Sequence, residues 1–248
     1  MIGPPGCTGR DLQTLRHRRF ALDPATLVFK ERIDGGLDGY VWKVYFGDAG
    51  PFALKVFWDA APPEFYHYYA PQQECHNAAV LQKMAAAVAS GPVLIYNAPE
   101  TKEDALSNFY PYSDESRLAQ KSVENLETMD GTRLISSILR MVQCHGWLRL
   151  SGSVFPTLPL SLRPPSMKVG KIQRSMSSRK EYIALVYELV EDGENLPAAV
   201  EEVADFLWCA GFSHTLSPAA RNWKIGVLVI WEISSTLAVF GGSNRSTE

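Results

Sequence analysis

Lys55 and Glu74 are the two residues whose types and spacing most suggest chemistry. Lys55 stands in the apolar run 52–58, and in a strand its side chain would share a face with Ala53 and Phe57. Such a lysine must reach water, as lone strand lysines usually do, or find an acceptor. Glu74 follows 19 residues later, at the head of the apolar stripe of a helix-forming stretch. The spacing leaves room for the strand end, a loop and the first helical turn, and so allows the two side chains to form an ammonium–carboxylate pair. Alternatively, Glu74 only favours the helix amino terminus, worth about 0.3–1 kcal/mol.

A glycine-rich turn precedes the lysine. Residues 35–39 contain three glycines and lead into two runs of β-forming residues, 40–46 and 52–57, joined by the turn 47–50. The pattern predicts a β-hairpin that is preceded by a flexible glycine-rich turn. An ordinary glycine hairpin without a ligand has the same composition, and this alternative stays open.

Five residues of the hairpin stand in the order of two motifs, G-x-G-x-x-G-x-V and A-x-K: Gly36, Gly39, Val41, Ala53 and Lys55. Asp34 stands where the first motif begins with glycine. This order resembles the amino-terminal lobe of a protein kinase. The resemblance implies that Lys55 meets nucleotide phosphates and is held in place by Glu74.

The elements that must position these residues follow along the chain. A helix is predicted over 71–91, where Pro71 suits the first turn and Gly91 the end. Its inward stripe comprises Glu74, Ala78, Leu81, Ala85 and Val88. Further strands are predicted within 134–150 and over 182–188. The resemblance implies an α+β, protein-kinase-like fold: a five-stranded antiparallel small lobe with one helix, followed by a truncated helical lobe.

The strand 182–188 runs into an acidic stretch, LVEDGENLP. By the kinase resemblance, Tyr187 occupies the gatekeeper position, and Glu188 to Val190 form the hinge whose backbone would hold adenine. The resemblance therefore allows weak ATP binding, although no cofactor is required.

A helix is predicted from Pro197 to Gly211, and its inward residues are Val200, Val203, Ala204, Leu207 and Ala210. The following stretch, FSHTLSPAARNWKIGVLVI, resembles a kinase catalytic loop. His214 matches the histidine of H-R-D, and Asn222 matches the later asparagine that would hold metal.

The catalytic loop also departs from the kinase pattern. Leu216 stands where the catalytic aspartate is needed, and the loop is one residue longer before Asn222. A strand predicted over 225–229 leads to Ile230, where a metal-binding aspartate is expected. Isoleucine offers magnesium no oxygen ligand, so no metal site is predicted.

Composition limits the classes of protein. A chain of 248 residues with 46% hydrophobic residues forms one globular unit or two small lobes. The net charge of −3 and the pI of about 6.0 argue against nucleic-acid binding by the whole surface.

The cysteines indicate an intracellular protein, because none of the four has metal-ligand spacing. They are Cys7, Cys75, Cys144 and Cys209. No secretory signal is visible, and the apolar run 225–240, about 16 residues, is too short to span a bilayer and is predicted as core strands.

Three regions are predicted. Residues 1–26 are a basic lead-in; 27–196 are the small lobe, with polar insertions near 99–132 and 151–180; and 197–248 are the remnant of a second lobe, with an atypical tail from residue 230. Within the second insertion, 163–180 contains basic residues and no acidic one. This segment is the best candidate for binding an acidic partner or nucleic acid, although charge runs are most often only solvated.

Three longer stretches, FKERIDGGLDGYVWKVYFGD, PFALKVFWDAAPPEFYHYYAPQQEC and FSHTLSPAARNWKIGVLV, resemble a fungal family of kinase-like proteins described as a subunit of the kinetochore Sim-four complex. The resemblance covers about residues 27–229. It implies a nuclear, centromere-associated role with protein partners and no membrane.

Three classes of function therefore remain open. The missing aspartates favour a non-catalytic interaction module. The Lys55–Glu74 pair leaves room for an atypical ATP-dependent kinase or small-molecule phosphotransferase that uses Asp38, Asp59 or Asp192. A third alternative is an unrelated α+β binding domain in which the glycine turn is only structural.

Overall fold

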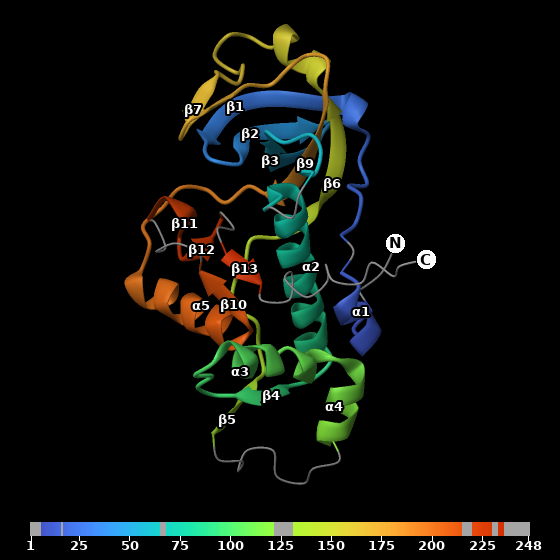
Figure 1. Ribbon diagram of the computed structural model, residues 1–248, viewed down its shortest axis with the longest axis vertical. Coiled ribbons are helices and arrows are strands. Elements are labelled where there is room, and N and C mark those ends of the chain that lie inside the picture. Colours follow the sequence, from blue (N-terminus) through green and yellow to red (C-terminus); the bar gives the residue numbers. More distant parts are fainter. Residues whose placement is uncertain are drawn as a thin grey trace. The chain divides into compact units, whose positions relative to one another are not determined.

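The computed structural model describes residues 6–15, 17–64, 68–121, 131–214, 220–229 and 233–235. The chain divides into two compact units (Figure 1). The sheet unit comprises His17–Cys75 and Val142–Val190, and the mixed unit comprises the described parts of Met1–Arg16, His76–Met141 and Glu191–Glu248. Each unit is defined by its internal contacts, and the domain boundaries that we predict from the sequence stay a prediction.

Five strands form one antiparallel sheet in the sheet unit (Figure 1). They are β1 (Leu27–Gly35), β2 (Gly39–Phe46), β3 (Ala49–Phe57), β6 (Cys144–Ser151) and β9 (Glu181–Glu188). Their order in the sheet is β1-β2-β3-β9-β6, and every neighbouring pair is antiparallel. The predicted five-stranded antiparallel sheet of an α+β chain is confirmed, and β2 and β3 form the predicted hairpin.

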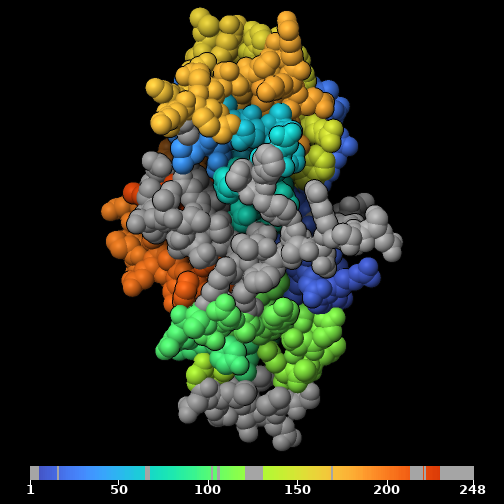
Figure 2. Space-filling model, viewed as in Figure 1, coloured from blue at the N-terminus to red at the C-terminus, as the bar shows by residue number. Residues whose placement is uncertain are grey.

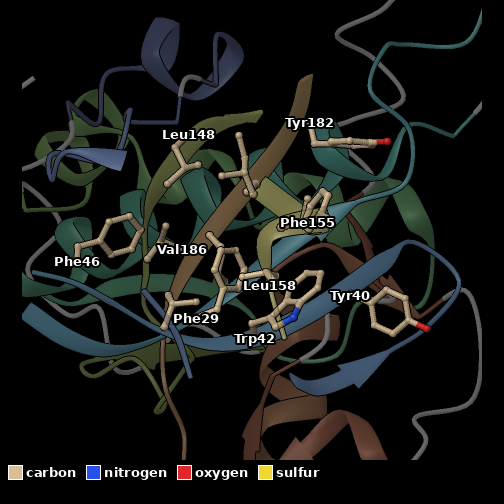
Figure 3. Packing of buried hydrophobic residues seen from close by; sticks show 14 of the residues in the cluster. Phe29, Tyr40, Trp42, Phe46, Leu148, Phe155, Leu158, Tyr182 and Val186 are labelled. Atoms are coloured by element: carbon tan, nitrogen blue, oxygen red, sulfur yellow. The ribbon is translucent and has the colours of Figure 1, made fainter. Parts of the chain in front are cut away.

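One face of this sheet packs into an aromatic core (Figure 3). Trp42 is fully buried, and its ring stacks on that of Phe155 with centroids 5.9 Å apart. The same cluster contains Leu54 and Val56 of β3 and Trp58, which directly follows the strand. Phe52 of β3 packs against this cluster. The predicted face 52, 54, 56 and 58 is therefore confirmed, because side chains alternate along a strand.

The second predicted insertion, 151–180, contains regular structure and is not only a loop. η4 (Gly152–Thr157) carries Phe155 into the aromatic core, and β7 (Met167–Val169) pairs with β8 (Ile172–Arg174). A few apolar side chains in a polar stretch are enough to anchor it, because each buried aromatic ring removes a large apolar area from water. The short 3₁₀-helix η1 (Pro24–Thr26) precedes β1.

The helix α2 spans Ala70–Ala89, close to the predicted range. Four residues of the predicted stripe are buried, but Ala85 is exposed. In its place Val80, Met84 and Ala87 are fully buried. The helix is buried over a wider arc than a single stripe, which the periodicity of its apolar residues does not reveal.

The predicted polar insertion near 99–132 contains regular structure in its described part. It contains α3 (Lys102–Ser107), η2 (Tyr110–Tyr112) and α4 (Asp114–Lys121), while β4 (Val93–Tyr96) pairs with β5 (Thr132–Ile135). Phe109 and Tyr112 are buried. The buried Asn108 side chain bonds the backbone of Tyr96 and Cys209. These anchors hold the stretch in the mixed unit.

The amino-terminal lead-in is folded where it is described. α1 (Gly9–Gln13) begins with a capping box between Thr8 and Asp11, and Leu12 is buried. In the sheet unit, Phe20 packs against the aromatic core. The lead-in is therefore more than a solvated tail.

The helix α5 (Pro197–Cys209) has the predicted bounds within two residues. Val203, Leu207 and Ala210 are buried, whereas Val200 and Ala204 are half-buried. Phe206 and Cys209 complete the buried face.

The strand predicted over 225–229 is instead a hairpin. β11 (Trp223–Lys224) pairs with β12 (Val227–Leu228), and β10 (Phe212–His214), which lies before the short η5 (Ala220–Asn222), pairs with β13 (Ile233–Ser235). Ile225 and Gly226 between the paired strands have φ of 52° and 71°. Positive φ at both positions makes a tight two-residue turn, which an apolar run does not signal. No helix in the described part of the chain is long and apolar enough to cross a membrane.

Candidate functional site

Lys55 and Glu74 form a buried ion pair within the sheet unit. Lys55 is on β3 and Glu74 is in the first turns of α2, where its Oε1 accepts a hydrogen bond from the lysine Nζ. Lys55 is 8% exposed and Glu74 is 1% exposed. The predicted contact between these residues is present. In this setting each charge requires the other, because an unpaired buried charge is costly.

The second oxygen of the Glu74 carboxylate is also hydrogen-bonded. The buried Tyr187 hydroxyl, near the end of β9, donates to Oε2 at 2.9 Å. Burial raises the pKa of Glu74, while Lys55 and the Tyr187 hydrogen bond oppose the rise. Burial, followed by the neighbouring Glu74, raises the pKa of Tyr187. The sequence pointed to Tyr187 only as a gatekeeper, and nothing in its surroundings signalled a bond to a residue 113 positions away.

Val41 and Ala53 lie on the same sheet face as Lys55. Val41 is directly opposite Lys55 in the β2–β3 pair, and Ala53 precedes Lys55 by two residues, so alternation turns their side chains to one side. Both are half-buried. The face opposite the aromatic core thus combines a buried ion pair with a partly open apolar surface.

The glycine turn is held against β3. The indole Nε1 of Trp58 donates to the Gly36 carbonyl at 3.0 Å, and its backbone N–H donates to the Asp38 carbonyl at 2.9 Å. Gly36 N–H also donates across the turn to the Gly39 carbonyl. A Cβ on Gly39 would lie 2.0 Å from the Val56 carbonyl oxygen, so only glycine fits. Gly39 therefore has a packing role, whereas a Cβ on Gly36 would meet nothing within 4 Å.

Asp38, at the tip of this turn, adds negative charge to the site. Its Oδ2 accepts a hydrogen bond from the Tyr68 hydroxyl at 3.1 Å. Asp38 is also among the charges that raise the pKa of Glu74. A polyphosphate approaching Lys55 would meet this carboxylate as well as Glu74, and like charges repel.

The predicted hinge residues are engaged with their own chain. The Glu188 backbone N–H donates to the Gln143 carbonyl at 2.9 Å, and its side chain accepts from the Gln143 N–H at 2.8 Å. Val190 is buried. The Glu188 N–H is thus already used within the sheet unit.

A pocket of about 600 Å³ opens on the β1–β2 hairpin of the sheet unit. Its lining comprises Val28, Lys30, Glu31, Lys43, Tyr45, Gly47 and Asp48. None of the residues that we predict to bind nucleotide is among them. The pocket contains two basic and two acidic side chains, so its charge does not select one class of ligand.

His214 and Asn222, which match catalytic-loop positions, belong to the mixed unit. His214 lies in β10, opposite Ile233. Asn222 is buried, and its carbonyl accepts a hydrogen bond from the Val229 N–H. Leu216 and Ile230, at the positions of the two missing aspartates, lie outside the described residues.

The other carboxylates proposed as catalytic are engaged in ion pairs. Asp59 pairs with Arg174 in the sheet unit. Asp192 pairs with Lys224 at 2.7 Å in the mixed unit. Across the ranges that the structure describes, no group of three or more His, Cys, Asp or Glu side chains could hold a metal ion.

His17 and Cys144 form a contact that the sequence did not suggest. The His17 Nε2 lies 2.8 Å from the Cys144 Sγ, although 127 positions separate them. Burial lowers the pKa of His17 to about 4 and raises that of the Cys144 thiol. Burial also raises the pKa of Cys75 to about 12. These thiols stay protonated at neutral pH and are therefore poor nucleophiles.

Comparison with known proteins adds no relative. No protein-family model, no curated protein and no solved structure matches this chain.

Proposed function

We propose that this protein is a kinase-like interaction module that does not transfer phosphate. The observation that carries the proposal is the Lys55–Glu74 pair, buried on the sheet face that also bears Val41 and Ala53. In protein kinases a lysine of the third strand pairs with a helix glutamate in this way and meets the nucleotide phosphates. The five-stranded antiparallel sheet supports the same interpretation.

Any nucleotide binding at this face is weak and depends little on magnesium. The Lys55 charge is already matched by Glu74, and the glycine turn is held against β3 with Asp38 at its tip. The sequence positions of the catalytic base and of the metal ligand hold Leu216 and Ile230. Phosphoryl transfer depends on metal ions and preorganised charge, which these side chains do not supply.

The biological role that we propose is that of a nuclear, centromere-associated subunit that binds other proteins. It rests on the sequence resemblance to the family of the kinetochore Sim-four complex. The buried Lys55–Glu74–Tyr187 network bears only on the non-catalytic part of the proposal, because a network with both carboxylate oxygens bonded stabilises the fold without any ligand.

The test is a thermal-shift titration with ATP, once with magnesium and once with EDTA. A ligand at 100 times its Kd stabilises a protein by about 2.7 kcal/mol. We expect a small shift at millimolar ATP that is equal in both conditions. The control is Ala53→Leu, which fills the half-buried surface beside Lys55, keeps both charges of the ion pair and should remove the shift. Because Ala53 lies directly opposite Tyr187 in the β3–β9 pair, the melting temperature without ATP should first be compared with that of wild type.

The alternative function is an atypical phosphotransferase. A large shift that requires magnesium would favour it and overturn the proposal. A total absence of shift in wild type and Ala53→Leu would support a module that binds proteins alone.

A further inference from the structure

The basic segment, residues 163–180, concentrates positive charge on an otherwise acidic chain. It contains six of the 24 lysines and arginines and none of the 27 aspartates and glutamates. The remainder of the chain therefore has 18 basic against 27 acidic residues. Figure 2 shows part of this segment in yellow and orange on the surface.

Two of the six cations anchor the segment to the sheet unit. The Arg163 guanidinium donates to the carbonyls of Leu158 and Pro156, each at 2.7 Å. The Arg174 guanidinium forms an ion pair with Asp59. These two arginines are bound into the fold and are not free to receive a partner.

The end of the segment is also attached. The Ser177 N–H donates to the Tyr182 hydroxyl at 2.6 Å, and the Lys180 carbonyl accepts from the Gly152 N–H at 2.7 Å. Between these attachments, Met167 and Met176 pack against the aromatic core. The segment is therefore a fixed platform, unlike a charge run in a solvated tail.

The other four cations, Lys168, Lys171, Arg179 and Lys180, are exposed on this platform. No carboxylate of the described residues forms an ion pair with any of them. Ile172, next to Lys171 at the β7–β8 turn, is 56% exposed. The register pairs Val169 with Ile172 and Lys168 with Gln173, so Ile172 and Lys168 lie on opposite faces of this hairpin. A partner therefore reaches the apolar contact of Ile172 together with the charge of Lys171 at the hairpin tip.

We propose that the basic segment is a docking surface for an acidic segment of a protein partner that also carries aliphatic side chains. This inference rests on the proposed function as an interaction module and names the chemistry of its partner. Acidic side chains match the four exposed cations, and an aliphatic side chain of the partner covers Ile172.

The composition favours a protein over nucleic acid. Residues 163–180 include no aromatic side chain on which a base could stack, and stacking supplies much of single-strand binding. A long duplex would extend past the basic segment and meet the acidic remainder of the chain.

The experiment uses the full chain and fluorescence anisotropy with four labelled probes. These are a glutamate-rich peptide of 15 residues with two leucines, the same peptide with serines for the leucines, a single-stranded oligothymidine and a DNA duplex of equal charge. The leucine peptide should bind tightest, and its affinity should fall as salt rises.

Charge-reversal variants locate the site. Lys168→Glu/Lys171→Glu should weaken binding of the leucine peptide by about tenfold or more, because each reversal replaces an attraction by a repulsion. Ile172→Ser should lower affinity for the leucine peptide and leave the serine peptide unchanged. The matched control is Lys30→Glu/Lys43→Glu on the β1–β2 hairpin, which should stay within about twofold of wild type. Melting curves verify that each variant is folded.

Three results would overturn the inference: tighter binding of either DNA probe, equal loss in the control variant, or no binding of the leucine peptide. The ATP titration distinguishes failure of this inference from failure of the proposed function. Lys168→Glu/Lys171→Glu should leave the ATP response unchanged, and Ala53→Leu should leave peptide binding unchanged.

Discussion

Glu74 accepts hydrogen bonds from two donors that arrive from different strands. Lys55 Nζ bonds one carboxylate oxygen and the Tyr187 hydroxyl bonds the other. Because the carboxylate is almost fully buried, water cannot replace either donor. The stability of the site therefore depends on all three residues together.

Tyr187→Phe removes one donor and keeps the ring. We expect the free energy of unfolding in urea to fall by about 1–3 kcal/mol, the cost of an unsatisfied buried acceptor. The control is Tyr45→Phe, a half-buried tyrosine of β2, which should change stability by less than about 0.5 kcal/mol. Equal, small effects in both variants would show that the Tyr187–Glu74 bond contributes nothing.

Lys55→Met leaves the carboxylate without its counter-charge. The expected cost is about 3–5 kcal/mol, as for other buried pairs that lose one partner. Lys55→Met/Glu74→Gln, which removes both charges, should recover a large part of that loss. A double variant as unstable as the sum of the two single variants would contradict the coupling.

His17 should make stability depend on pH. The pKa of His17 is lowered from 6.5 to about 4 in the folded state, chiefly by burial and secondly by Arg18. At pH above 6.5 the His17 imidazole is unprotonated in both the folded and the unfolded chain, and its contribution to the free energy of unfolding is fully present. As pH falls towards 4 the unfolded chain takes up the proton first, so stability falls, by about 3 kcal/mol in all.

The measurement is urea unfolding of wild type and His17→Gln at pH values from 7 to 4. The pKa values of His76 and His145 are also lowered by burial. Because wild type and His17→Gln both contain these two histidines, their effect cancels in the stability difference. The stability difference between wild type and His17→Gln should shrink as pH falls. A constant difference would show that His17 does not titrate abnormally.

At the scale of elements, the glycine turn joins β1 to β2 and lies against β3. The indole and backbone N–H groups of Trp58 donate to the Gly36 and Asp38 carbonyls and keep the turn close to the strand that carries Lys55. The turn therefore contributes to packing, whether or not it meets a phosphate.

Two glycine variants separate packing from ligand binding. Gly39→Ala should lower the free energy of unfolding by about 2 kcal/mol or more, because its Cβ would overlap the Val56 carbonyl. Gly36→Ala has open space and should cost less than about 1 kcal/mol. Denaturation midpoints of both proteins provide the comparison, and equal stability would contradict the observed close approach of Gly39 to β3.

At the scale of the whole molecule, phosphate transfer needs a base, metal ligands and a nucleotide site in one arrangement. We expect the chain to transfer no phosphate at a meaningful rate. Introducing one carboxylate with Ile230→Asp should not produce activity, because the stretch from His214 to Asn222 is one residue longer than the kinase pattern that it resembles and a shift of about 1 Å can cost about a hundredfold.

A radiolabelled-phosphate assay checks this expectation on wild type, Lys55→Ala and Ile230→Asp. Both autophosphorylation and generic protein substrates should be scored. Wild-type incorporation that disappears in a folded Lys55→Ala variant would demonstrate catalysis and contradict the binding-module proposal.

Features with a local period or a short separation along the chain could be predicted from the amino-acid sequence alone. Alternation along 52–58 and the helical spacing from Glu74 predicted the strand face and the helix, and the kinase resemblance pointed to the ion pair between them. These predictions succeeded because periods of 2 and 3.6 residues follow from backbone geometry alone. Only 19 positions separate Lys55 from Glu74, so few alternative arrangements compete.

Features that depend on partners far away in the sequence became visible only in the folded chain. The Tyr187–Glu74 and His17–Cys144 contacts join residues 113 and 127 positions apart, and the exposure of Ala85 depends on which elements cover α2. The helices in 99–121 are held by buried Phe109 and Tyr112. Packing of this kind overrides local polarity, because burial of a few large side chains outweighs the weak preference of a polar stretch for water.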